Sequence, residues 1–114
     1  MNYQLLYGDQ IIGEVAEDDS DFPTCFGKYK LISGFQDDPE FAHLLSYIDY
    51  SIRVWPLIEA DRMDEIDYEE EAQFVDLIES GNWWLVDQNG KRIAILIPVF
   101  GTDNHINWRL DPGR

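Results

Sequence analysis

The two ends of the chain have the apolar pattern of β-strands, and the middle has that of helices. Near the N-terminus, apolar runs at 5–7 and 11–15 flank the turn-forming residues 8–10, which predicts a β-hairpin. The run 17–21 contains four acids and interrupts this pattern, so we expect an exposed loop there. The apolar residues within 25–32 indicate a third strand.

A first helix is expected to begin at Pro39. The Asp38 side chain can cap the free N–H groups of the first turn, and a proline at the first helical position loses no hydrogen bond. The apolar residues that follow recur mostly at intervals of three and four, which places them on one helix face. They are Phe41, Leu44, Leu45, Ile48, Ile52 and Trp55. Pro56 predicts that the helix ends or kinks near Val54 and Trp55.

A second helix is expected between Asp67 and Ser80. Asp67 is a capping residue, and Glu70 three positions later completes a capping-box pattern. Gly81 is well placed to end this helix. The residues that the helix is predicted to bury are Ala72, Phe74, Val75, Leu77 and Ile78.

The last third of the chain returns to strand patterns. Residues 83–86 and 91–99 flank the pair Asn89-Gly90, the strongest short-range signal for a hairpin. In a final strand, Ile106, Trp108 and Leu110 alternate with polar residues. The expected order is β-β-(β)-α-α-β-β-β in a single α+β domain spanning 1–114. Its antiparallel sheet combines an N-terminal hairpin with a C-terminal three-stranded meander, packed with two principal helices.

Neighbouring residues in the strands 83–86 and 91–99 are both apolar, although they point to opposite faces of the sheet. An antiparallel sheet with one wet face alternates apolar and polar residues instead. We therefore expect both faces to be covered, by helices on two sides, by strong curling of the sheet, or by a second copy of the chain. Ile93, Ile95 and Ile97 are predicted to point one way, and Ala94 and Leu96 the other.

The charge of the chain narrows the range of partners. Its 114 residues contain 23 Asp and Glu against 8 Lys and Arg, a formal net charge of −15. This field repels nucleic-acid backbones and anionic membranes, so neither is expected as a partner. The single cysteine, Cys25, cannot form an intrachain disulfide, and we find no signal peptide and no membrane-spanning run. A cytoplasmic protein is the expectation.

No catalytic or metal-binding motif is evident. His43 and His105 lie 62 positions apart, and no Cys-His spacing is typical of a zinc site. Cys25 next to Phe26 is more typical of a small buried hydrophobe than of a nucleophile. We therefore expect no cofactor, no metal and no catalysis. The competing hypothesis is a small metal-assisted hydrolase that uses carboxylates from the acidic loops.

Two surfaces could bind a protein partner. The segment 59–71 has eight acids and one arginine, a net −7. A second stripe on the first helix contains Tyr47 and Tyr50, which either pack on the second helix or form an aromatic contact surface. The sequence favours a binding or inhibitory module for a basic protein. The alternatives are self-association as a homodimer and a charge that serves only solubility. The candidate contact residues are Asp61, Asp64, Glu65, Glu69, Tyr47 and Tyr50.

The N-terminal quarter resembles the opening of a group of small acidic bacterial proteins to which no activity is attached. The residues in question are Leu5, Gly8-Asp9, Ile12-Gly13 and Val15, followed by Ser20-Asp21-Phe22-Pro23 and Gly27. The resemblance implies a stand-alone bacterial cytoplasmic protein, and it implies no ligand and no functional residue. Immunity proteins of polymorphic toxins share the size and acidity, but no motif connects the chain to one such family.

Overall fold

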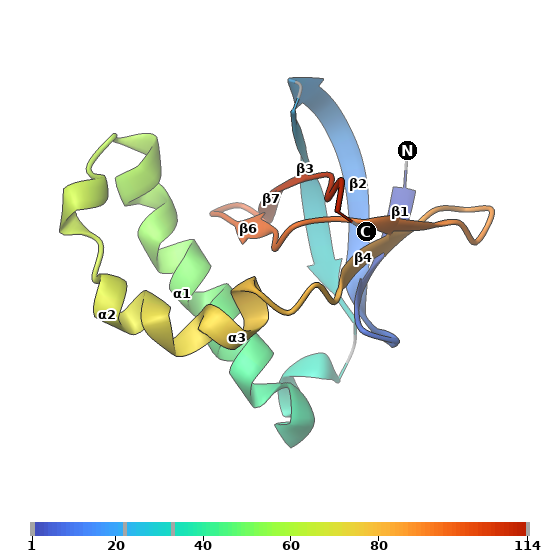
Figure 1. Ribbon diagram of the computed structural model, residues 1–114, viewed down its shortest axis with the longest axis horizontal. Coiled ribbons are helices and arrows are strands. Elements are labelled where there is room, and N and C mark those ends of the chain that lie inside the picture. Colours follow the sequence, from blue (N-terminus) through green and yellow to red (C-terminus); the bar gives the residue numbers. More distant parts are fainter. Residues whose placement is uncertain (1, 22, 33, 114) are drawn as a thin grey trace.

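The computed structural model describes residues 2–21, 23–32 and 34–113, and Phe22 of the N-terminal run lies outside these ranges. The described chain has the α+β fold that the sequence predicts, with helices on one side of a strongly curled antiparallel sheet (Figure 1). The strands are β1 (Asn2–Tyr7), β2 (Gln10–Asp21), β3 (Thr24–Leu31), β4 (Trp83–Val86), β5 (Arg92–Ala94), β6 (Val99–Phe100) and β7 (His105–Arg109). The α-helices are α1 (Ala42–Glu59), α2 (Tyr68–Glu71) and α3 (Val75–Ile78). Short 3₁₀ turns are η1 (Phe35–Asp37), η2 (Pro39–Phe41), η3 (Met63–Glu65) and η4 (Ala72–Phe74).

The predicted N-terminal hairpin is present, but the acidic run 17–21 is not a loop. It is the second half of β2, which pairs with β3 as far as Asp21 opposite Thr24. The pairing shifts register between Glu17 and Asp19, where a bulge interrupts the ladder. Antiparallel strands are held by backbone hydrogen bonds, so a long hairpin tolerates acids where its side chains meet solvent.

The sheet curls until its two ends meet. Its strand order is β5-β4-β1-β2-β3-β7-β6 in the described part of the chain. The predicted strand 91–99 is divided, because the chain leaves β4 after Ala94 and turns to β7. An isolated bridge joins Ile95 to Leu110, and the Leu96 N–H donates to the Arg109 carbonyl at 2.9 Å. Strong curling, which the sequence allowed as one way of covering the sheet, is present and encloses the inner face.

The first helix begins where the sequence predicts and ends later. The Asp38 side chain accepts from the Glu40 N–H at 3.0 Å, and Pro39 starts the 3₁₀ turn that leads into α1. The helix does not end near Trp55; it continues through Pro56 to Glu59. A proline in the last turn removes only one helical hydrogen bond, and the packing of Trp55 on His105, with ring centroids 4.8 Å apart, holds this turn against β7.

The second helix is shorter and more broken than predicted. Asp67 caps it as expected and accepts from the N–H groups of Glu69 and Glu70. The 3₁₀ turn η4 separates α2 from α3. The pattern of exposed and buried residues is therefore not that of one continuous helix. Among the five residues predicted to be buried, only Phe74 and Leu77 are. The predicted burial was wrong for Ala72, Val75 and Ile78, which are exposed.

The core lies between the inner face of the curled sheet and α1. Its largest fully buried side chains include Trp83, Phe100, Leu5, Ile48 and Leu85. The Trp83 indole N–H donates to the Leu77 carbonyl at 3.0 Å, which fixes α3 to β4. Alternating strand residues thus contribute to one common core.

The outer face of the sheet is only partly covered, which corrects the expectation of two covered faces. Ile95 is buried, whereas Leu96, which points to the opposite face, is 46% exposed. Trp84 is half-buried because the Arg92 guanidinium lies 4.5 Å from the centre of one of its rings. Leu110, which the alternation of the final strand placed on the buried face with Ile106 and Trp108, is 55% exposed. Arg92 thus covers this face at Trp84, and Leu96 stays exposed.

Candidate docking surface

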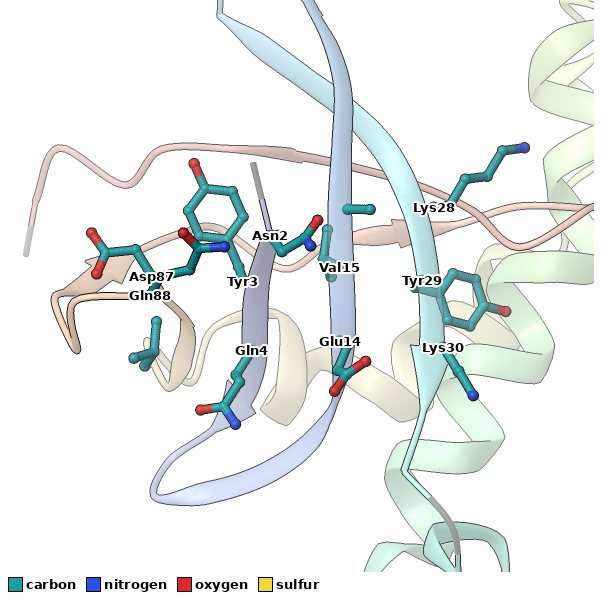
Figure 2. Close-up of a pocket in the computed structure, with 12 residues that line it drawn as sticks. Asn2, Tyr3, Gln4, Glu14, Val15, Lys28, Tyr29, Lys30, Asp87 and Gln88 are labelled. Atoms are coloured by element: carbon teal, nitrogen blue, oxygen red, sulfur yellow. The ribbon is translucent and has the colours of Figure 1, made fainter.

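A shallow depression of about 560 Å³, lined by both polar and apolar side chains, lies on the sheet formed by β1, β2 and β3, next to the end of β4. Gln4, Glu14 and Lys30 are cross-strand neighbours there, and Figure 2 shows them side by side on three strands. Lys28 extends away from Glu14 and donates to the Asp103 carbonyl at 3.1 Å. The described residues that line this depression include no Ser, Cys or His, the residue types that most often supply a nucleophile or a general base. The surface offers scattered amides and mixed charges.

The described ranges 2–21, 23–32 and 34–113 contain neither a metal-ligand cluster nor a membrane-spanning helix. No group of three or more His, Cys, Asp or Glu side chains within them is placed to hold a metal ion. No helix in these ranges is both long and apolar enough to cross a membrane. Cys25 is half-buried on β3. Burial raises the pKa of its thiol most, and the negative charge of the nearby Glu17 carboxylate raises it further. A raised pKa keeps the thiol protonated, and the thiolate is the reactive form.

The negative charge is concentrated in the helical part of the molecule. Residues 34–81 contain 14 of the 23 acids and only two bases, Arg53 and Arg62, a net −12. The rest of the chain contains nine acids and six bases, a net −3. Both arginines are already paired, Arg53 with Glu70 at 2.7 Å and Arg62 with Glu65. The helical side therefore presents a strongly negative field, and the sheet side a nearly balanced one.

The four acids predicted as contact residues all lie at the solvent-facing end of this region. Asp61 follows α1 in the left-handed conformation, with a φ of 57°, and turns the chain towards η3. Asp64 and Glu65 belong to η3, and Glu69 belongs to the first turn of α2. All four are exposed. The structure thus brings them to one end of the helical layer (Figure 1), although Glu65 is engaged by Arg62.

The two tyrosines predicted as contact residues are in the core, and this corrects the aromatic-surface interpretation. Tyr47 is 6% exposed and donates its hydroxyl to the Pro98 carbonyl at 2.8 Å. Tyr50 is 2% exposed, and its ring lies against Phe74 with centroids 5.4 Å apart. Burial raises the pKa of both hydroxyls. The stripe packs on the α2–α3 segment, the other outcome that the spacing allowed.

The acidic segment also exposes apolar side chains that its sequence pattern did not predict. Tyr68 is 56% exposed and Met63 is 46% exposed, and the Tyr68 hydroxyl donates to the Met63 carbonyl at 3.3 Å. On α3, Val75 is 49% exposed and Ile78 is 38% exposed. Each of these is an apolar residue in a largely polar stretch of sequence. The spacing of apolar residues along a helix does not by itself say which face meets solvent.

No family model, curated protein or solved structure matches this chain. The function must therefore be argued from the surface itself.

Proposed function

We propose that the protein is a non-catalytic binding or inhibitory module that docks a basic protein through the segment 59–71. The supporting observation is the pairing of two features in one place. Tyr68 and Met63 are exposed inside the densest run of acids in the chain. Aromatic residues and methionine are enriched at protein interfaces, whereas solubility alone calls for charge and not for exposed apolar anchors.

The two features have different physical roles in docking. Exposed carboxylates attract a basic surface over the Debye length, about 10 Å at 0.1 M salt, and so raise the association rate. Once contact is made, burial of Tyr68 and Met63 slows dissociation, because buried anchors contribute most of the binding energy. The earlier candidates Tyr47 and Tyr50 are buried and pack on Phe74, so neither is part of the proposed contact surface.

Affinity capture from a native lysate tests this proposal. The variant Asp61→Lys, Asp64→Lys, Glu65→Lys and Glu69→Lys changes the net charge from −15 to −7. A control with the same net charge reverses four exposed acids elsewhere, Glu14, Asp18, Asp19 and Glu40. We expect a basic protein to be captured by the wild type and the control at low salt, and by neither at about 1 M, where the Debye length is about 3 Å.

The reversed variant should capture none of this protein at either salt concentration. Capture that is equal in the two variants would mean that only net charge matters. Retention of the partner by the reversed variant, or no basic partner at all, would refute docking through 59–71.

A further inference from the structure

Four exposed apolar residues lie on successive turns of the helical segment 68–78. They are Tyr68, Ala72, Val75 and Ile78. Backbone hydrogen bonds connect these turns, because the Ala72 N–H donates to the Tyr68 carbonyl and the Val75 N–H donates to the Ala72 carbonyl. Ile78 follows three residues later, at the end of α3. Residues three or four apart are neighbours on a helix surface, so the four side chains form one apolar row.

The row is held outward, because the other side of the same segment is anchored in the core. Phe74 and Leu77 are buried on that side. The Phe74 ring contacts the rings of Tyr47 and Tyr50, and the Trp83 indole N–H donates to the Leu77 carbonyl at 3.0 Å. Single exposed apolar residues are common on protein surfaces, whereas a continuous apolar patch on a fixed element is typical of a contact surface.

Acids accompany the row along one flank. Glu69, Asp76 and Glu79 are exposed, and each of them directly follows a residue of the row. Consecutive residues are about 100° apart around a helix, so these carboxylates lie beside the row and not on it. Residues 63–79 contain eight acids and no Lys or Arg, and Asp76 also contacts His43 at 3.0 Å. The complement of this face is therefore an apolar stripe with cationic groups beside it.

Charge and spacing decide which occupant fits the row. Two copies joined through this face would bring together two segments of eight acids each, and like charges oppose that contact. An extended basic segment has the right charge, but its side chains on one face repeat about every 6.7 Å. The row repeats about every 5.4 Å, one helical turn. A helix has the same repeat, so its side chains can pack between those of the row.

We infer that the row Tyr68, Ala72, Val75 and Ile78 binds an amphipathic helix of the basic partner, with Lys or Arg residues beside the apolar stripe of that helix. The inference rests on the proposed function and adds the secondary structure of the partner to it. It predicts that the surface distinguishes two arrangements of the same residues at equal charge, which long-range attraction alone does not.

Two capped peptides of the same length and composition, made of leucine, alanine and lysine, test the inference. In the first peptide the leucines recur at intervals of three and four, and in the second they are spread evenly around the helix. Each peptide is titrated into the full chain by calorimetry at low salt. We expect the first to bind about tenfold tighter, the difference that burial of one aliphatic side chain makes. Its helicity, followed by circular dichroism, should rise on binding, because short isolated helices are marginal in water.

The double variant Val75→Ser and Ile78→Ser tests the row itself. Serine, valine and isoleucine have similar helix propensities, and the net charge does not change, so the segment and its long-range attraction should be preserved. We expect the variant to lose most of the preference and to bind the second peptide as the wild type does. The matched control Ile11→Ser and Leu96→Ser replaces two similarly exposed aliphatic residues outside the helical segment and should keep the preference.

Four results would contradict the inference. Equal binding of the two peptides, or a preference that the double variant keeps, would overturn helix binding by the row and leave the acidic docking surface standing. A preference without a gain in helicity would overturn it in favour of an extended segment. Sedimentation that shows a wild-type dimer and a monomeric double variant would show that a second copy covers the row. Binding of neither peptide would refute both proposals.

Discussion

Ser51 on α1 forms two hydrogen bonds with the backbone of Phe100, at the edge of the sheet in β6. Its hydroxyl donates to the Phe100 carbonyl at 2.9 Å and accepts from the Phe100 N–H at 2.8 Å. Ser51 is 3% exposed, so water cannot replace it without rearrangement. β6 ends the strand order, and an edge strand needs its backbone groups covered. The Ser51 hydroxyl satisfies these backbone groups at Phe100.

The variant Ser51→Ala leaves both backbone groups of Phe100 buried without a partner. Each such group costs about 1–3 kcal/mol, so we expect a loss of about 3 kcal/mol in the free energy of unfolding. At about 2.1 cal/mol/K of unfolding entropy per residue, the whole chain loses about 4 °C of melting temperature per kcal/mol. The expected fall in melting temperature is therefore about 10–15 °C.

Thermal and urea unfolding, followed by circular dichroism, measure this effect. The matched control is Ser46→Ala, one turn earlier on the same helix, where the exposed hydroxyl donates only to the Ala42 carbonyl. We expect the control to change stability by less than about 0.5 kcal/mol, because alanine is the better helix former. Equal effects of the two substitutions, or a loss below about 1 kcal/mol for Ser51→Ala, would refute the role of the edge cover.

Two further substitutions test the packing of the sheet. Gly27→Ala should unfold the protein or lower its urea midpoint more than any surface change, since a Cβ there would lie 2.2 Å from the Ala16 carbonyl oxygen; a native-like midpoint would contradict the close approach of β2 and β3. His105 stacks on Trp55, and burial, followed by the charge of Lys28, lowers its pKa from 6.5. Its neutral form therefore stabilises the fold above pH 6.5, and this contribution falls as pH drops towards the lower folded pKa, because the unfolded chain then binds the proton first. His105→Phe should flatten that part of the urea-unfolding profile between about pH 7 and 5, and an unchanged difference between variant and wild type over this range would contradict it.

Local chemistry was sufficient to predict the starts of the helices and one hairpin. Asp38 and Asp67 cap helix starts because their carboxylates reach N–H groups two or three residues ahead. The turn at 87–90 forms because Gly90 adopts a φ of 83° and Asp87 accepts from two nearby N–H groups. These interactions lie within four residues, so the sequence contains them in full.

Features that depend on distant residues could not be predicted in the same way. The acidic half of β2 is a strand because β3 pairs with it, and strand propensity gave no indication of that pairing. Tyr50 is buried because Phe74 lies against it, a contact across 24 positions. The capping-box role of Glu70 fails because its carboxylate binds Arg53 instead.

The negative charge of the candidate surface could be predicted from the sequence, but its exposed apolar residues, Tyr68 and Met63, could not. Six of the eight acids of 59–71 are exposed, as charged residues generally are, and Glu70 and Glu71 are half-buried. The exposure of Tyr68 and Met63 depends on how η3 and α2 are placed against α1, which helical spacing alone does not determine. The sequence therefore identified the segment, and the structure identified the residues within it that contact solvent.

Hydrogen exchange of the full chain, measured with and without the captured basic protein, tests the docking surface most directly. We expect slower exchange of backbone N–H groups within 61–78 on binding, and unchanged exchange in β1, β2 and β3 around the depression on the sheet. Protection of those three strands, with no change in 61–78, would place the partner on the sheet and contradict the account.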